Sequence, residues 1–285
     1  MDTDKKNTRE EGILRIAIQT KGRLNEDSTA LLIQSGVSVG DSSRKFLSKS
    51  ETFPMEILYL RDDDIPGAVF SGAADIGIVG YNEVLEKGFG VKVLDKLGFG
   101  GCRLSIAVPG GFPYDGPSSL EGKRIATSYP GILSSFLKEK RINATIETIA
   151  GSVEVAPAIG MADAIFDIVS SGGTLKKNGL REVDRVIESE AVLICGEGLS
   201  PEKEAALSQL RFRFRKFLFC RVQFPFCIGP QAERIGAFPL FFVFLANALL
   251  YLFFHDLRVF GSDPVSALFV KHDRKENQCR VGDKH

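Results

Sequence analysis

The chain has 285 residues, and its 36 basic and 36 acidic side chains give a formal net charge of zero at pH 7. A chain of this length can bury a substantial core and has room for two or three domains, while the balanced charge provides no overall field that would attract nucleic acid. The five cysteines stand at irregular spacings without a Cys-x-x-Cys pair, and the polar N-terminus lacks the apolar stretch of a secretory signal. We therefore expect a cytoplasmic protein with reduced thiols and no nucleic-acid partner.

Strands and helices alternate along residues 1–210. The expected strands are 13–19, 55–60, 75–79, 104–108, 123–127, 144–149, 164–169 and 185–193. The expected helices are one from a cap at Asn25 to Gly36, then 62–72, 132–140, a short turn at 175–179, and 199–210 with Ser200 as its cap. This alternation predicts an α/β fold with largely parallel sheets.

The histidines exclude several chemistries. All three, His255, His272 and His285, lie near the C-terminus, outside residues 1–210. Ser-His-Asp hydrolysis and histidine-based zinc sites are therefore excluded from the predicted α/β region.

The stretch 164–179 is typical of an anion site. An apolar strand containing Asp167 opens into Ser170, Ser171, Gly172, Gly173 and Thr174, and a helical turn follows from Leu175. In such a loop the backbone N–H groups and hydroxyls donate hydrogen bonds, and glycine lets a ligand approach the chain. Asp167 is placed to hold sugar hydroxyls, so the pattern favours a phosphorylated sugar; the alternative is a tight turn that binds nothing.

A longer pattern around this loop resembles the signature of the ATP phosphoribosyltransferases, the first enzymes of histidine biosynthesis. The matching residues are Glu154, Gly160, Ala162, Ile165, Asp167, Ser171, Gly172, Thr174 and Leu175. The resemblance extends over residues 14–210. It implies a two-lobed fold like that of the type II periplasmic binding proteins, with the site in the cleft between the lobes.

The resemblance also implies the reaction. N1 of ATP's adenine attacks C1 of 5-phosphoribosyl 1-pyrophosphate (PRPP), and pyrophosphate leaves. The loop 170–175 would bind the 5-phosphate of PRPP, with Glu154 and Asp167 on the ribose side. We expect Mg²⁺ as cofactor, held mainly by substrate oxygens and water, and no metal site built by the protein. A homo-oligomer is expected, and a membrane partner is not.

Three further stretches fit the family and predict contacts with ATP or polyphosphate. Lys21, Gly22 and Arg23 follow the first strand, where two cations flank a glycine that permits close approach. Asp75 begins a strand expected to face the cleft, and Arg103 lies beside an expected crossing between the lobes. We name Glu154, Asp167 and Lys21 as the catalytic candidates. Without the resemblance, residues 21–23 would be explained by a solvated turn, and Arg103 by an exposed side chain without a role. Strands like the one at Asp75 are frequent in binding proteins of this fold, and Glu154 would be the acidic start of a helix.

The expected domains are lobe I (1–104 and 193–210, the ATP side), lobe II (105–192, the PRPP side) and a segment 211–285 of different composition. More than half of the 22 phenylalanines lie in that segment, and residues 235–254 carry no charge. It shows no trace of the histidine-binding regulatory domain that longer family members carry there, so inhibition by histidine is expected to be weak or absent. Three interpretations remain open for it: a membrane anchor, a buried helix of a third domain, and a reading-frame change in the coding sequence.

The alternative function is a non-enzymatic solute-binding protein of the same two-lobed fold, tethered to a membrane through 235–254.

Overall fold

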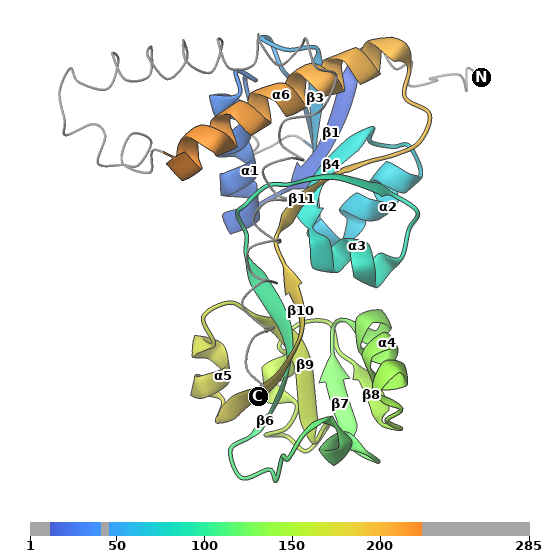
Figure 1. Ribbon diagram of the computed structural model, residues 1–285, viewed down its shortest axis with the longest axis vertical. Coiled ribbons are helices and arrows are strands. Elements are labelled where there is room, and N and C mark those ends of the chain that lie inside the picture. The colour runs from blue at the N-terminus through green and yellow to red at the C-terminus, as the bar shows by residue number, and fades with distance from the viewer. Residues whose placement is uncertain (1–11, 41–45, 224–285) are drawn as a thin grey trace, which may run out of the picture. The chain divides into compact units, whose positions relative to one another are not determined.

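The computed structural model describes residues 12–40 and 46–223, without the side chains of 219–223, and Figure 1 shows how its elements are arranged. The strands are β1 (Leu14–Gln19), β2 (Leu47–Lys49), β3 (Met55–Leu60), β4 (Ile76–Gly80), β5 (Lys92–Lys96), β6 (Cys102–Pro109), β7 (Arg124–Thr127), β8 (Thr145–Thr148), β9 (Ala164–Val169), β10 (Leu180–Ser189) and β11 (Ala191–Cys195). The α-helices are α1 (Arg23–Gln34), α2 (Ile65–Phe70), α3 (Tyr81–Lys87), α4 (Pro130–Lys140), α5 (Gly173–Lys177) and α6 (Pro201–Gln223). Short 3-10 turns are η2 (Asp62–Asp64), η3 (Pro117–Leu120) and η4 (Val153–Val155).

The first sheet has the strand order β2-β3-β1-β4-β11-β5, and with its helices it forms lobe I. Its centre is parallel, because β1 pairs with both β3 and β4 in the same direction. Ile16, Ala17 and Ile18 are consecutive and all fully buried, as expected for a strand covered on both faces. Helices α1 and α6 pack on one face, and α2 and α3 on the other.

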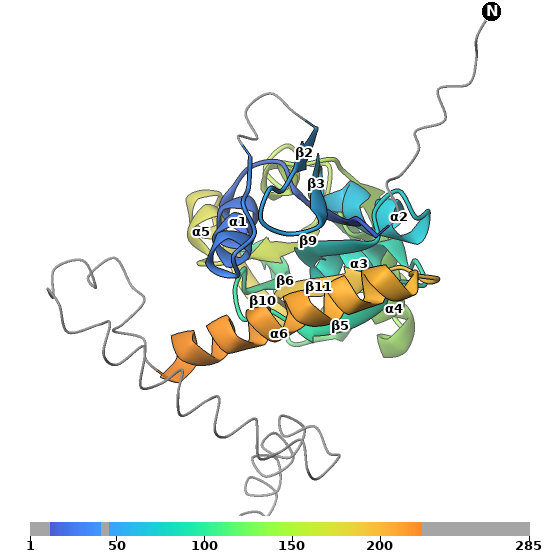
Figure 2. The same cartoon turned by 90° about the horizontal axis from the view of Figure 1, so that it is seen from above.

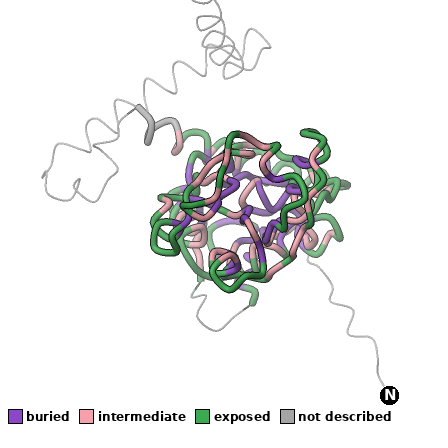
Figure 3. The backbone as a smooth tube through the Cα atoms, turned by 90° about the horizontal axis from the view of Figure 1, so that it is seen from below, coloured by how far each residue is buried: buried purple, intermediate pink, exposed green. Residues whose placement is uncertain are grey.

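The second sheet has the order β10-β6-β9-β7-β8 and forms lobe II. Strands β7, β8 and β9 are parallel, whereas β6 runs antiparallel to β9 and β10. One face packs on α4, through residues that include Leu104, Phe166 and Leu133. The other face packs on η4 and α5, through Val153 and Leu175. The buried positions therefore lie inside each lobe. Figure 3 shows buried backbone in purple with exposed segments in green around it.

Two connections join the lobes. The chain leaves lobe I after β5 and returns at Glu190, between β10 and β11. The expected boundaries at 104/105 and 192/193 fall a few residues inside β6 and β11. The two-lobed α/β fold predicted from the sequence is confirmed for the described residues.

Helix α6 continues well past Leu210, where the expected helix ends. Leu207, Leu210 and Phe214 are buried in the core of lobe I, at the spacing of one helix face. On a neighbouring face, Arg211 and Arg215 both contact the carboxylate of Asp95 on β5, at 2.5 and 3.0 Å. Figure 2 shows α6 running beside β5 and β11. The segment Arg-Phe-Arg-Phe-Arg (211–215) is thus helical although its phenylalanines and arginines alternate in sequence. Leu210 and Phe214, four residues apart, share the buried face, and Arg211 and Arg215 share the face towards Asp95.

Two other local expectations are wrong. The expected strand 185–193 is two strands in different sheets, because β10 pairs with β6 and β11 pairs with β4. Asn25 does not cap α1, which begins at Arg23; its side-chain amide instead donates to the carbonyl of Gln19 at 2.5 Å.

No helix within 12–40 and 46–223 is both long and apolar enough to cross a membrane. The segment 235–254 and the three interpretations of 211–285 concern residues that mostly lie outside the described ranges.

Candidate functional site

The carboxyl ends of the parallel strands in the two lobes lie on the sides that meet. In lobe I these ends are followed by Thr20, Arg61 and Tyr81, and in lobe II by Ser128 and Ser170. The backbone N–H of Tyr81 donates to the carbonyl of Glu190 at the crossing, at 2.9 Å. We call this region the inter-lobe edge. Ligands of α/β proteins bind at the carboxyl ends of parallel strands, so this is the candidate site.

The loop 170–175 follows β9 at the inter-lobe edge. Gly172 has a φ of 75°, which places it in the left-handed region that glycine adopts without strain. The Ser171 hydroxyl accepts from the N–H of Gly173, while no acceptor in the described part of the chain takes the N–H groups of Ser171 and Gly172. Thr174 is exposed, and Leu175 is buried as the anchor of the loop. Because α5 has only five residues, the donors of the loop, rather than a helix dipole, are what an anion would meet.

Asp167 lies two residues before the end of β9, opposite Ser105 of β6. Its carboxyl group is half-buried and points to the face that η4 covers, as its neighbours Ile165 and Val169 do. The pKa of Asp167 is raised to about 6, mainly by burial and to a smaller extent by the nearby carboxylate of Glu154, while the backbone N–H of Ile168 opposes the rise. Glu154 is therefore near enough to Asp167 to affect its charge, and η4 and the loop adjoin the same face of lobe II.

Glu154 lies in η4, a single 3-10 turn. The sequence pattern suggested that it starts a helix, but no α-helix follows. The two residues before Glu154 fix this turn in the fold. Ser152 adopts a left-handed φ of 51°, and the side chain of Val153 is buried in the core of lobe II. A non-glycine residue in that conformation is uncommon and marks a backbone held by its surroundings.

Lys21, Gly22 and Arg23 lie at the inter-lobe edge of lobe I, and all three are exposed. Gly22 has a φ of 92° and precedes α1, a helix of 12 residues. Thr20 ties this turn to the end of β3, since both its N–H and its hydroxyl donate to the carbonyl of Leu60 at 2.8 Å. The two cations therefore stand where an anion can approach them and the first amides of α1.

Arg61 was not singled out from the sequence. It follows β3 directly, so it lies at the same edge as Lys21, and its side chain is 80% exposed while contacting Asp63 at 3.1 Å. Its position after a predicted parallel strand was the signal that could have identified it.

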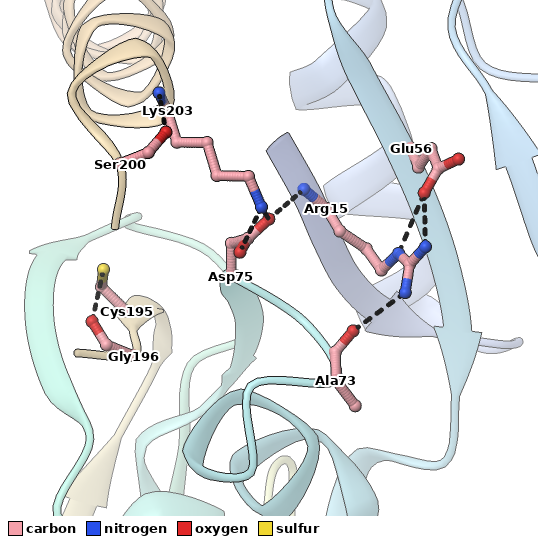
Figure 4. Close-up of polar contacts among 8 residues, drawn as sticks. All are labelled: Arg15, Glu56, Ala73, Asp75, Cys195, Gly196, Ser200 and Lys203. Carbon is pink, nitrogen blue, oxygen red and sulfur yellow. Dashed lines mark hydrogen bonds and ion pairs between the residues drawn. The ribbon is translucent and has the colours of Figure 1, made fainter. Parts of the chain in front are cut away.

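Asp75 is not at the inter-lobe edge. It stands before β4, whose amino end lies beside Arg15 at the start of β1, so it occupies the opposite end of the sheet from Lys21. Its carboxylate accepts 2.9 Å hydrogen bonds from Lys203 of α6, as Figure 4 shows, and the side chain is 8% exposed. The expectation that Asp75 faces the nucleotide is therefore corrected: this buried pair attaches α6 to the sheet.

Arg103 lies at the inter-lobe edge as expected, but its guanidinium is already engaged. It donates to both carboxylate oxygens of Glu182 on β10, at 2.5 and 2.6 Å, and to the carbonyl of Ser170 at 2.9 Å. Its contact is with the loop 170–175 of lobe II.

A buried polar cluster that the sequence did not reveal joins the lobes. Asn82 of α3 exchanges hydrogen bonds with Ser189 of β10, and the hydroxyl of Tyr129 donates to Glu83 at 3.0 Å. Burial raises the pKa of Glu83 to about 7, although the hydrogen bond from Tyr129 lowers it. Beside the cluster, Glu86 accepts from two backbone amides at the start of α4, at 2.8 and 2.9 Å.

Comparison with known proteins relates this chain to a family. A sequence model of the family described as ATP phosphoribosyltransferase matches residues 61–216. The chain is 54% identical over 202 residues to an ATP phosphoribosyltransferase of Parabacteroides distasonis, and 53% identical over 201 residues to one of Bacteroides thetaiotaomicron. These matches cover 71% and 70% of this chain, and 71% of each relative.

Solved structures agree. The chain is similar to one in the ATP phosphoribosyl transferase (HisG:HisZ) complex from Thermotoga maritima, with a TM-score of 0.63, 27% identity, and coverage of 72% of this chain and 98% of that one. The alkanesulfonate-binding protein SsuA from Xanthomonas axonopodis pv. citri has a TM-score of 0.50 at 15% identity, covering 75% of each chain, and shows the likeness of fold alone.

Proposed function

Because the chain belongs to the ATP phosphoribosyltransferase family, whose members join ATP to PRPP in the first step of histidine biosynthesis, we propose that the inter-lobe edge is where this reaction takes place and that lobe II holds PRPP. The observation that carries this assignment is the convergence of Asp167, Glu154 and the loop 170–175 on one end of β9. Exposed amides and hydroxyls in the same region as two carboxylates suit a ligand that has a phosphate at one end and vicinal hydroxyls at the other.

In this proposal the 5-phosphate accepts hydrogen bonds from the backbone N–H groups of Ser171, Gly172 and Thr174 and from the side-chain hydroxyls of Ser170, Ser171 and Thr174. Gly173 lets the phosphate approach the chain closely, and Leu175 anchors the loop. Asp167 and Glu154 accept from the ribose hydroxyls, which requires Asp167 to be ionised. Asp167 is therefore expected to bind the ribose hydroxyls most strongly at pH values above its raised pKa.

ATP is assigned to lobe I, where Lys21, Arg23 and Arg61 follow the parallel strands. Their positive charges attract the triphosphate, and during the reaction they stabilise the charge that develops on the departing pyrophosphate. Gly22 keeps the backbone between the two cations uncovered. Lys21 is a catalytic candidate in this electrostatic sense, because the displacement needs alignment of the two substrates more than covalent help.

The side chains around the proposed site are compatible with a Mg²⁺ ion whose ligands come mainly from the substrates. No group of three or more His, Cys, Asp or Glu side chains gathers within the described ranges, and Mg²⁺ commonly keeps water and phosphate oxygens as its ligands. When bound, the ion would neutralise charge on the pyrophosphate, and Asp167 and Glu154 are the nearby carboxylates that could orient it. A homo-oligomer and a cytoplasmic location belong to the same proposal.

The test is turnover by the full-length chain with ATP, PRPP and Mg²⁺, measured as formation of phosphoribosyl-ATP and release of pyrophosphate. We expect Asp167→Ala to lower kcat/KM for PRPP by about a hundredfold, as loss of a group that orients substrate does. Asp115→Asn is the matched control, since Asp115 is an exposed aspartate of the loop between β6 and β7. If the wild type binds PRPP without turning it over, the chain is a binding protein of this fold and the proposal fails.

A further inference from the structure

Arg103 has three donors in use, and all of them contact lobe II. Two reach the carboxylate of Glu182 in a fork at 2.5 and 2.6 Å, and the third reaches the Ser170 carbonyl at 2.9 Å. The hydroxyl of Ser105 also donates to Glu182, at 2.9 Å. The side chains of Arg103 and Glu182 are only 18% and 21% exposed. A paired arginine of this kind has one favoured orientation.

The strands place these side chains together. Arg103 and Ser105 alternate along β6, so both point to the face of the sheet that η4 and α5 cover. Ser105 is registered with Asp167 on β9, and Glu182 with Ala107. The hydrogen bonds from Arg103 and Ser105 lower the pKa of Glu182 to about 2, against the effect of burial, so the carboxylate stays charged at neutral pH.

The hydrogen bond to Ser170 determines the direction of a peptide unit. In a trans peptide the carbonyl of one residue and the N–H of the next point in opposite directions. Because the Ser170 carbonyl points to Arg103, the N–H of Ser171 points away from Arg103. That N–H is the first donor of the loop and has no acceptor among the described residues.

We propose that Arg103 and Glu182 are positioning residues for PRPP: Glu182 orients Arg103, and Arg103 holds the Ser170–Ser171 peptide with its N–H directed at the 5-phosphate. This inference rests on the assignment of PRPP to lobe II. It replaces the expectation that Arg103 contacts polyphosphate itself, because its positive charge is already balanced by Glu182 and each of its three nitrogens already donates a hydrogen bond within lobe II.

Glu182→Gln separates the two roles by the sign of its effect. The substitution weakens the fork and removes a negative charge from the neighbourhood of the loop. If Arg103 positions the loop, the Kd and KM for PRPP rise about tenfold, while KM for ATP changes less than twofold. If Arg103 instead binds the phosphate directly, release from Glu182 strengthens PRPP binding, and that result would overturn the proposal.

Arg103→Lys gives a second, independent readout, since it keeps the charge and loses the fork. Positioning predicts a loss of PRPP affinity as large as that of Glu182→Gln, whereas a direct charge contact predicts that most of the affinity remains. Asp163→Asn is the control, because Asp163 forms another arginine–carboxylate pair in lobe II, with Arg124 at 3.3 Å, that does not touch the loop.

Binding of PRPP to the full-length variants is measured by isothermal titration, with circular dichroism to verify folding. If Glu182→Gln does not fold, Ser105→Ala removes one of the donors to Glu182, and we expect a smaller change in the same direction. If the wild type binds no PRPP, the proposed function is wrong. If the wild type binds PRPP and both Glu182→Gln and Arg103→Lys bind it as tightly, only the positioning role is wrong.

Discussion

Glu83 makes the stability of the protein depend on pH in a direction opposite to that of most carboxylates. Its side chain is 5% exposed and accepts hydrogen bonds from Tyr129 and Asn82. Burial raises its pKa from 4.5 to about 7. The folded protein therefore holds this proton more tightly than the unfolded chain does, so folding is favoured at low pH, and the advantage is lost as pH rises from about 4.5 through 7.

The difference between the two pKa values corresponds to roughly 3 kcal/mol. Glu83→Gln keeps an oxygen that accepts from Tyr129 but cannot ionise. The stability of the variant relative to the wild type should therefore increase between pH 5 and pH 8, by about 2 to 3 kcal/mol. Comparing the two pH values removes any constant effect of the substitution on packing.

Urea unfolding of the full-length wild type and Glu83→Gln at pH 5 and pH 8 measures this change. Glu139→Gln, an exchange at a side chain that is 73% exposed, is the control and should show no such pH dependence. A Glu83→Gln variant that differs from the wild type by the same free energy at both pH values would refute the reasoning, because it would mean that Glu83 does not change its ionisation in this interval.

Two further predictions concern the site and helix α6. At pH values below about 6, kcat/KM for PRPP should decrease, because Asp167 takes up its proton. The 5-phosphate also titrates in this range. The pH profile of Asp167→Asn lacks the contribution of Asp167, so comparing it with the wild-type profile identifies the part due to Asp167. Phe214→Ala should destabilise the fold by about 3 to 5 kcal/mol, because a large buried side chain leaves a cavity, whereas exposed Phe212→Ala should change the urea midpoint little; equal effects of the two would show that α6 does not pack beyond Leu210.

Local patterns were enough to predict much of lobe I and lobe II. The strand 55–60 was predicted to the residue, because it is a short, mainly apolar run that acidic helix-start residues follow. The signature around Asp167 and loop 170–175 was predicted to adjoin a strand end, which the structure confirms. Both features depend on residues close together in sequence.

The remaining differences depend on pairing between distant segments. Nothing local to Glu190 shows that β10 joins one sheet and β11 the other, since this single residue separates the two strands. The engagement of Arg103 by Glu182 requires two strands separated by 79 positions. Asp75 is different, because its place before a parallel strand already put it at the end of the sheet opposite Lys21, which follows one.

The arrangement of β11 has a consequence for synthesis of the chain. Strand β5 belongs to lobe I but, among the strands that the structure describes, pairs only with β11, and β11 also separates it from β4. On a ribosome, β5 is therefore made long before the strand that receives it, and lobe II, which is continuous in sequence, can complete its sheet first. Until residues 191–195 emerge, β4 lacks its neighbour β11 and leaves an edge of the lobe I sheet unpaired. An unpaired strand edge favours aggregation, so the growing chain is exposed to aggregation in that interval.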